Sequence, residues 1–298
     1  MTIGITGATG FIGRHLLAAA RNAGHDVIGY SRTPEPRAGF VEMRAWLPVR
    51  GADFSGLDAL VHLAGENLLG QWTKRRRAAI RASRVNDTCA LVARLRELPR
   101  PPRVLVSAGG CAFYGDGGEA ELTEGAPAGT GFISEVARAW EDAAMEGADL
   151  MRVVTLRTGM VLGADGGAAP MLRRIFRLCL GGRLGSGRQW VPWLHVSDLA
   201  RLILHAVECE ALRGPVNAVA PGAVRNADFT RAIAGVLRRP AVLPVPAFIL
   251  KRLPGGMGDI FLHSQRAVPA AAQATGFTWL FPEIAGAARD VFAAELSH

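Results

Sequence analysis

Three glycines near the start of the chain are spaced for binding a dinucleotide. Gly7, Gly10 and Gly13 lie between an apolar segment, residues 2–6, and a segment of helical periodicity, residues 11–23. The first glycine permits a tight turn, the second lets the backbone approach a pyrophosphate, and the third lets helix and strand pack closely. The helix amino terminus then offers N–H groups to the phosphates. A glycine pattern alone is weak evidence, and the strand and helix around it distinguish this site from an ordinary glycine-rich turn. The predicted contacts are Gly7, Thr9, Gly10, Phe11, Ile12 and Gly13.

The choice of dinucleotide depends on the residues that follow the next strand. NAD-specific folds place Asp or Glu there to bind the ribose 2′-hydroxyl. This chain has Ser31 and Arg32 instead. A guanidinium can hold a 2′-phosphate through two hydrogen bonds, and Ser31 can donate another. The sequence therefore predicts NADP(H) as cofactor, with a merely solvated Arg32 as the alternative.

Two further loops are expected at the same edge of the sheet. In open α/β sheets, ligands bind at the carboxyl ends of the strands. One loop follows the strand expected at residues 59–63, and the other follows the strand expected at residues 103–107. The expected cofactor contacts in these loops are Leu63, Ala64, Gly65, Glu66 and Ser107.

Strand and helix signals alternate along the first half of the chain. Strands are expected at residues 2–6, 26–30, 40–46, 59–63, 103–107, 152–157 and 216–219, and helices at 11–23, 75–98, 132–147 and 199–209. This alternation predicts an α/β fold of the Rossmann type, with a doubly wound parallel sheet. We expect a cofactor domain at residues 1–160, completed by about 190–220, and a smaller, mostly helical substrate domain from residues 161–189 and 221–298.

The net charge of +8 invites a nucleic-acid hypothesis. The densest basic run, residues 74–77, is continued by Arg81 and Arg84, and apolar residues follow at helical spacing. It is therefore interpreted as the outer face of a helix packed on the sheet. Attraction of an anionic substrate and cofactor explains the charge equally well. We expect a small-molecule partner and no nucleic acid.

Cysteine usage and hydropathy argue against disulfide-rich, metal-binding, secreted and membrane-spanning proteins. Four cysteines are scattered without a C-x-x-C pair, so neither a disulfide framework nor a metal site is expected. The chain opens directly into an apolar strand, with no basic segment or cleavage site before it. No apolar run is long enough to span a bilayer. The expectation is a soluble cytoplasmic protein without a membrane segment.

Together these residues resemble the extended short-chain dehydrogenase/reductase superfamily, and in particular its atypical epimerase-family, sugar-nucleotide-epimerase-like subgroup. Some members of that subgroup carry a cell-division-inhibitor label. The resemblance covers almost the whole chain and is carried by LAGENL at residues 63–68, LRTGMVLG at 156–163, LGSGRQW at 184–190, WLHVSDL at 193–199, LPVP at 243–246, SQR at 264–266 and ATGF at 274–277. It implies NADP binding, a cleft between two domains, and a possible homodimer through the basic helix and the helix that contains Trp140.

The chain departs from the catalytic pattern that the resemblance implies. Superfamily enzymes use a serine and a Tyr-x-x-x-Lys pair, in which lysine lowers the tyrosine pKa. Here Phe132 stands at the tyrosine position, and glycines fall at the serine position. The lysine position is Val136, or Ala137 if the register shifts by one residue. Tyr114 and Ser107 remain as catalytic candidates, with structural roles as the alternative.

Two function classes therefore stay open. The first is an NADP-dependent oxidoreductase or epimerase that acts on a polar, nucleotide-linked or small substrate. Arg183 and Arg188 are its candidate substrate ligands, with solvated loop arginines as the alternative. The second is an NADP-binding sensor or interaction protein without catalysis, which the missing tyrosine and lysine favour.

Overall fold

A seven-stranded sheet forms the centre of the computed structural model, which describes residues 1–47, 49–68 and 70–293. The strand order is β12-β7-β5-β4-β1-β2-β3, and every neighbouring pair is parallel. The strands are β1 (Thr2–Thr6), β2 (Asp26–Ser31), β3 (Glu42–Ala45), β4 (Ala59–His62), β5 (Val104–Gly110), β7 (Arg152–Thr158) and β12 (Gly214–Ala218). The predicted doubly wound parallel sheet is confirmed.

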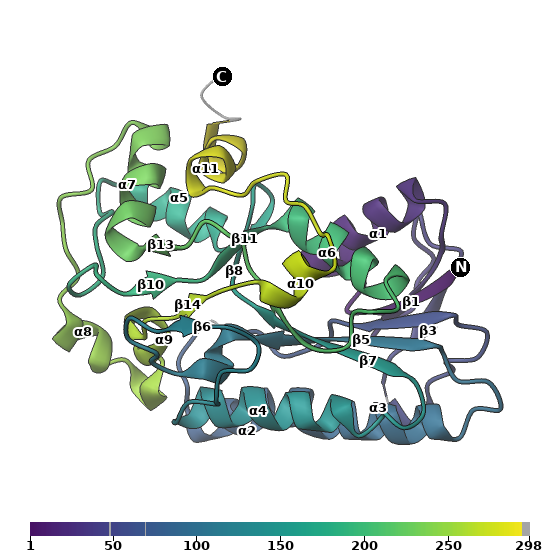
Figure 1. Ribbon diagram of the computed structural model, residues 1–298. Helices are drawn as coiled ribbons and strands as arrows, with labels where there is room; N and C mark the ends of the chain where they lie inside the picture. The colour runs from purple at the N-terminus through teal and green to yellow at the C-terminus, as the bar shows by residue number, and fades with distance from the viewer. Residues whose placement is uncertain (48, 69, 294–298) are drawn as a thin grey trace.

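Helices cover both faces of this sheet (Figure 1). On one face α1 (Phe11–Asn22) packs against α6 (Val196–Glu208). On the other lie α2 (Lys74–Arg81), α3 (Asp87–Arg96) and α4 (Phe132–Met145). Neighbouring residues of one strand enter different cores, because side chains alternate across a strand. Thus Val61 belongs to the core under α1 and α6, and Leu60 to the core under α3 and α4.

The basic segment is not one continuous helix. A five-residue π-helical turn, η2 (Ala82–Asn86), separates α2 from α3. Thr73 caps the start of α2, where its Oγ1 accepts a hydrogen bond of 3.2 Å from the N–H of Arg76. A π turn inserts an extra residue into the helix and redirects the side chains around it.

The remaining elements gather mainly beyond the carboxyl edge of the sheet, at the left of Figure 1. β8 (Met160–Gly163) lies between β9 (Gly166–Gly167) and β11 (Trp193–His195); β10 (Trp190–Val191) pairs with β13 (Val224–Arg225), and β6 (Glu121–Leu122) with β14 (Arg266–Ala267). The helices are α5 (Ala169–Arg177), α7 (Asn226–Leu237), α8 (Ala247–Lys251), α9 (Asp259–Leu262), α10 (Ala270–Ala274) and α11 (Ile284–Ala293). Short 3₁₀ turns are η1 (Val49–Gly51), η3 (Cys111–Tyr114) and η4 (Pro254–Gly256).

A buried carboxylate ties the end of the chain to the sheet. Asp198, on α6, is fully buried and accepts hydrogen bonds of 2.7 and 2.9 Å from the N–H groups of Leu280 and Phe281. These bonds satisfy a charge that would otherwise be costly to bury. The segment before α11 is thereby fixed against the face that carries α6.

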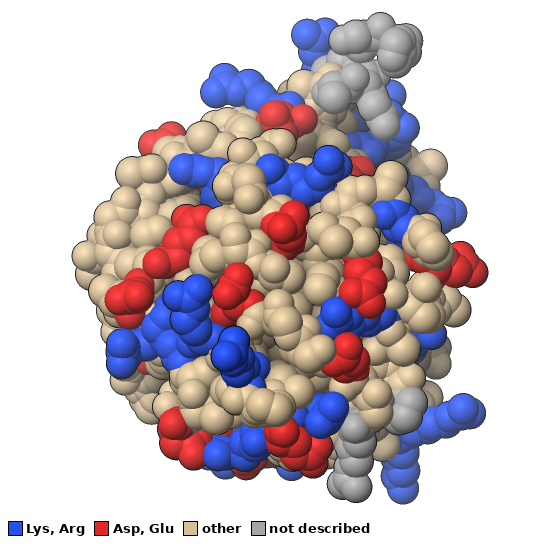
Figure 2. Space-filling model, turned by 90° about the vertical axis from the view of Figure 1, so that its right-hand side faces the viewer, with Lys and Arg blue, Asp and Glu red and all other residues tan. Residues whose placement is uncertain are grey.

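The surface mixes the two signs of charge. On the face shown in Figure 2, Lys and Arg are interspersed with Asp and Glu rather than gathered into one continuous basic stripe. Within the described ranges, no helix is long and apolar enough to cross a membrane.

Candidate cofactor cleft and adjoining cavity

The turn between β1 and α1 has the geometry of an anion cradle. Gly7 has a φ of +68°, in the left-handed region that favours glycine. A Cβ on Gly13 would lie 2.6 Å from the carbonyl oxygens of Gly7 and Ala8, so only glycine lets α1 approach β1 this closely. No side chain of the described residues caps α1 at Gly10. Its first N–H groups and its dipole therefore fit a pyrophosphate.

The side chain of Phe11 packs against the turn between β8 and β9. A Cβ on Gly163 or Gly166 would lie 2.7 or 2.3 Å from the Phe11 ring. The ring therefore packs against the β8–β9 turn, and the main chain of Phe11 belongs to the first turn of α1. Thr9 and Ile12, beside it, are half-buried.

Ser31 and Arg32 lie at the carboxyl end of β2, where the spacing predicts them. Arg32 is exposed and has no ion pair among the described residues. The Ser31 hydroxyl accepts a hydrogen bond of 3.3 Å from the N–H of Thr33. The guanidinium is thus open to an external anion, as a 2′-phosphate requires.

A buried histidine at the end of β4 supports the loop that follows this strand. His62 Nδ1 lies 2.8 Å from the Thr6 hydroxyl, and His62 Nε2 lies 3.0 Å from the Thr88 hydroxyl. Burial lowers the pKa of His62 to about 4, so the ring is neutral at physiological pH. The Thr6 hydroxyl also accepts the N–H groups of Leu63 and Ala64, at 3.1 and 3.2 Å. These hydrogen bonds fix the first two residues of the loop against β1.

Side chains from α2 and η2 hold the other end of the same loop. The N–H of Glu66 donates to the Ser83 hydroxyl at 3.0 Å. Arg76 pairs with the Glu66 carboxylate at 3.2 Å and donates to the carbonyl oxygen of Asn67 at 2.6 Å. Glu66 therefore anchors the loop through both its main chain and its side chain.

Ser107 lies inside β5 rather than in the loop after it, because β5 continues to Gly110. It is fully buried, and its hydroxyl donates to the carbonyl oxygen of Ala108 at 3.3 Å. It stands opposite His62 in the register of β4 and β5. This placement favours a structural role.

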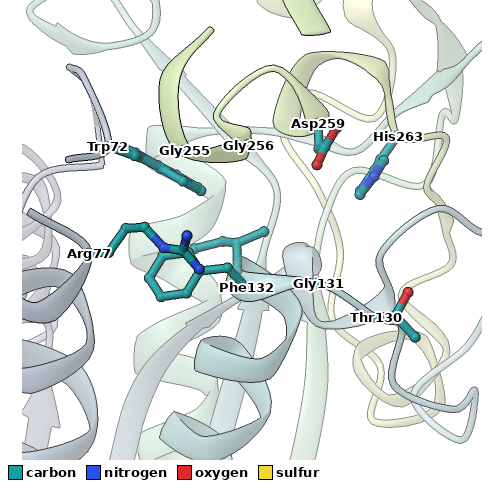
Figure 3. A pocket seen from close by; sticks show the side chains of 10 residues that line it. Trp72, Arg77, Thr130, Gly131, Phe132, Gly255, Gly256, Asp259 and His263 are labelled. Carbon is teal, nitrogen blue, oxygen red and sulfur yellow. The ribbon is translucent and has the colours of Figure 1, made fainter. Parts of the chain in front are cut away.

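A cavity of about 300 Å³ adjoins the start of α4 (Figure 3). Trp72 and Arg77 form one side; the Arg77 guanidinium lies 4.1 Å from the centre of the Phe132 ring, and the Trp72 ring lies 5.5 Å from it. Asp259 and His263, from the C-terminal part of the chain, face them across the cavity. The cavity thus combines two aromatic walls with one cation, one carboxylate and one imidazole.

A close contact brings the C-terminal segment to this cavity. Gly255 has a φ of +75°, and a Cβ there would lie 2.2 Å from the carbonyl oxygen of Trp72. Trp72 is itself buried, and its Nε1 donates to the carbonyl oxygen of Leu68 at 2.9 Å. Only glycine at position 255 allows η4 to approach the cofactor-binding half this closely.

Residues 3–218 match the family model described as NAD dependent epimerase/dehydratase family, and residues 245–291 match a domain of unknown function, DUF1731. The chain belongs to the NAD dependent epimerase/dehydratase family. The human epimerase family protein SDR39U1 is 35% identical over 298 residues, which cover 98% of this chain and 100% of that protein. The family protein YfhF of Bacillus subtilis is 34% identical over 296 residues, covering 95% of each chain.

Solved structures of this family agree with the fold. The crystal structure of human SDR39U1 with NADPH matches with a TM-score of 0.91 at 35% identity, covering 99% of this chain and 100% of that one. A nucleoside-diphosphate sugar epimerase from Corynebacterium glutamicum matches with a TM-score of 0.79 at 31% identity, covering 100% of this chain and 60% of that one.

In this epimerase-family chain, the positions of the missing tyrosine and lysine are filled by apolar side chains. Phe132 lines the cavity, whereas Val136 is fully buried in a cluster with Ile80 and Ile133. Neither side chain can exchange a proton. Any proton transfer in the cavity must therefore use a group from another element.

Tyr114 lies in a buried polar network. Its hydroxyl is 2.7 Å from Asn217 Oδ1 and 3.1 Å from the carbonyl oxygen of Thr123, and it accepts a hydrogen bond of 2.9 Å from Arg157. Arg157 in turn pairs with both carboxylate oxygens of Glu141. Burial raises the pKa of Tyr114 to about 12. These contacts favour the structural role over the catalytic one.

Arg183 and Arg188 do not line the cavity beside Phe132. Arg183 is exposed and borders a separate hollow of about 480 Å³, together with Thr230 and Arg231. Arg188 is also exposed, and its carbonyl oxygen accepts a hydrogen bond from Arg225. Their role as substrate ligands stays a prediction.

Proposed function

We propose that this protein binds NADP(H) and uses it in an oxidoreductase or epimerase reaction on a polar small molecule held in the cavity beside Phe132. The observation that carries the proposal lies at one sheet edge. There the uncapped glycine turn of Gly13 stands beside an Arg32 free to take a 2′-phosphate. The 35% identity with a human protein crystallised with NADPH supports the same cofactor.

The cavity supplies what a polar substrate needs for orientation. Bound NADPH supplies hydride chemistry, and the protein supplies position and charge. Arg77 can pair with an anionic or strongly polar group, and the rings of Trp72 and Phe132 offer flat apolar surface. The volume of about 300 Å³ suits the reacting part of a substrate, such as a sugar ring or a small carbonyl compound.

We assign proton exchange in this cavity to His263. Histidine is the side chain most often used to donate or accept a proton during catalysis. His263 lines the cavity opposite Phe132, and Asp259, one turn earlier, lies beside it (Figure 3). We also propose that residues 161–189 and 221–298 form the substrate half, because α9 and the residue that follows it bring Asp259 and His263 to the cavity.

A second function, an NADP(H) sensor without catalysis, is favoured by the apolar residues at positions 132 and 136. The test begins with a fluorescence titration of the protein with NADPH. Sugar nucleotides and small carbonyl compounds are then added to the complex, and NADPH oxidation is followed. Oxidation by any compound supports the reaction, and failure of NADPH to bind overturns both functions.

Variants of α2 separate the enzyme from the sensor. Arg77→Gln removes the cation of the cavity, and Arg75→Gln removes an exposed cation from the same helix. We expect Arg77→Gln to raise KM for the active compound about tenfold or more, as loss of a charge-assisted contact does, while Arg75→Gln leaves KM unchanged. NADPH that binds tightly and is consumed by no compound supports the sensor.

A further inference from the structure

Arg84 is a buried cation directly behind the loop that follows β4. Only 9% of the residue is exposed. A Cβ on Gly65 would lie 3.6 Å from the guanidinium carbon of Arg84. On its other side the guanidinium lies 5.0 Å from the centre of the Trp140 ring. Arg84 is thus enclosed between an aromatic ring and a predicted cofactor-binding loop.

No carboxylate neutralises this cation among the residues that the structure describes. Its hydrogen bond is a long one, 3.4 Å to the carbonyl oxygen of Ile80. Glu66 acts on it from a greater distance, and that carboxylate is already paired with Arg76. Burial lowers the pKa of Arg84 to about 10, which still leaves the side chain charged at neutral pH. Buried charges are normally paired, so the charge of Arg84, which no carboxylate offsets at close range, acts on whatever binds beside the loop after β4.

The backbone around Arg84 is also irregular. Arg84 is the central residue of the π turn η2 (Ala82–Asn86). Such turns are frequent at functional sites, because they redirect side chains toward a site. The preceding residue, Ser83, holds the N–H of Glu66 in the same loop. Two consecutive residues of the turn, Ser83 and Arg84, therefore contact the loop after β4.

The sheet order indicates which part of the cofactor lies near Arg84, and this step rests on the proposed function. Arg32, at the end of β2, marks the adenosine half of NADP(H) on the β2–β3 side. The pyrophosphate belongs at the glycine turn after β1. The nicotinamide half must therefore lie toward β4 and β5, whose loop Arg84 supports.

We propose that Arg84 makes this site selective for the oxidation state of the cofactor, favouring NADPH over NADP⁺. The nicotinamide ring of NADP⁺ carries a positive charge, which reduction to NADPH removes. A buried, unneutralised guanidinium on the nicotinamide side repels the oxidised ring and leaves the reduced ring unaffected. Attraction of Arg84 to the phosphates is the same in both forms, so it cancels in the ratio of the two dissociation constants.

The experiment measures Kd for NADPH and for NADP⁺ in four proteins. In the wild type we expect Kd for NADP⁺ to exceed Kd for NADPH. In Arg84→Met, which keeps the length but removes the charge, we expect the ratio to fall roughly three- to tenfold. Arg84→Lys retains the charge and is expected to keep most of the ratio. Arg81→Gln, which removes an exposed cation from the end of α2, is the matched control and leaves the ratio unchanged.

Thermal unfolding of each variant shows whether the fold is retained. Equal weakening of both cofactor forms in Arg84→Met would mean that Arg84 only supports the loop or the phosphates, and would overturn the proposal. A wild type that binds NADP⁺ as tightly as NADPH overturns it without any variant. A wild type that binds neither form contradicts the proposed function itself, so the two failures are distinguishable.

Discussion

At the scale of single residues, the Tyr114 hydroxyl separates a structural role from a catalytic one. Tyr114→Phe leaves Asn217 Oδ1 and one N–H of Arg157 without a buried partner. We expect the free energy of unfolding to fall by about 1–3 kcal/mol. NADPH binding and any turnover should persist, since the network lies apart from the cavity beside Phe132. Urea unfolding and a turnover assay check both parts, and loss of turnover at unchanged stability would restore the catalytic role.

Arg32 carries the second prediction at this scale. Arg32→Glu replaces a cation by a carboxylate that repels a 2′-phosphate and can accept a hydrogen bond from a 2′-hydroxyl. We expect the preference for NADPH over NADH to fall by about 100-fold or more, as loss of a charge-assisted pair and gain of repulsion combine. Arg37→Glu, another exposed arginine in the same loop, serves as the charge-matched control. An unchanged preference in Arg32→Glu would mean that another group selects the cofactor.

Residues with a local signature were accessible from the sequence, and residues defined by tertiary contacts were not. The spacing of Gly7, Gly10 and Gly13, between a predicted strand and a predicted helix, identifies them from the sequence. Arg84 belongs to a basic segment whose charges were interpreted as a solvated outer face, and nothing in the spacing distinguishes it from exposed Arg81. His263 lies far along the chain from Phe132, and only the fold brings it to the cavity.

At the scale of elements, the β1–α1 turn depends on the close approach at Gly13. Gly13→Ala places a Cβ 2.6 Å from two carbonyl oxygens, so the start of α1 must move away from β1. We expect Kd for NADPH to rise about tenfold or more and stability to fall by about 1–3 kcal/mol, because the clash outweighs the higher helix propensity of alanine. Gly235→Ala is the control, since an added Cβ on α7 meets open space. It should raise stability by up to about 1 kcal/mol.

Element boundaries were predictable where apolar runs end in glycine or polar residues. The first strand is confirmed at residues 2–6, and the first helix ends at Asn22, one residue before the predicted position. The segment expected as one helix at 75–98 contains η2, which periodicity does not reveal because one inserted residue barely alters the apolar spacing. The sequence does not predict the continuation of β5 to Gly110, because consecutive glycines are typical of loops.

At the scale of the whole molecule, two buried histidines and one half-buried histidine couple stability to pH. His62 lies under the cofactor loop, His195 packs beside Phe281, and His205 packs beside Phe277. Burial lowers the pKa of His195 and His205 below the ordinary value of 6.5, and that of His62 to about 4. His62 follows β4, whereas His195 and His205 belong to the cap and the last turn of α6 and pack against the C-terminal segment. Protonation therefore strains the loop after β4 and the attachment of the C-terminal segment together.

The sign of this coupling follows from where protons bind first. The ordinary pKa of histidine is 6.5, and that of His62 in the folded protein is about 4. At pH values between these two, His62 binds a proton in the unfolded chain but not in the folded one. Stability is therefore complete above about pH 6.5 and is lost as the pH falls toward 4, by about 3 kcal/mol for His62 alone. Carboxylates such as Asp58, whose pKa lies below the ordinary 3.8, act only at lower pH.

Urea unfolding between about pH 7 and pH 5 follows this contribution, because that range lies above the ordinary pKa values of Asp and Glu. We expect the free energy of unfolding of the wild type to fall steadily across that range. His62→Gln keeps hydrogen-bonding groups toward Thr6 and Thr88 but cannot take up a proton. The variant is less stable at pH 7, yet its stability should fall less steeply with acid. If its slope equals that of the wild type, the proton uptake belongs to His195 and His205, and the loop after β4 is not the acid-sensitive element.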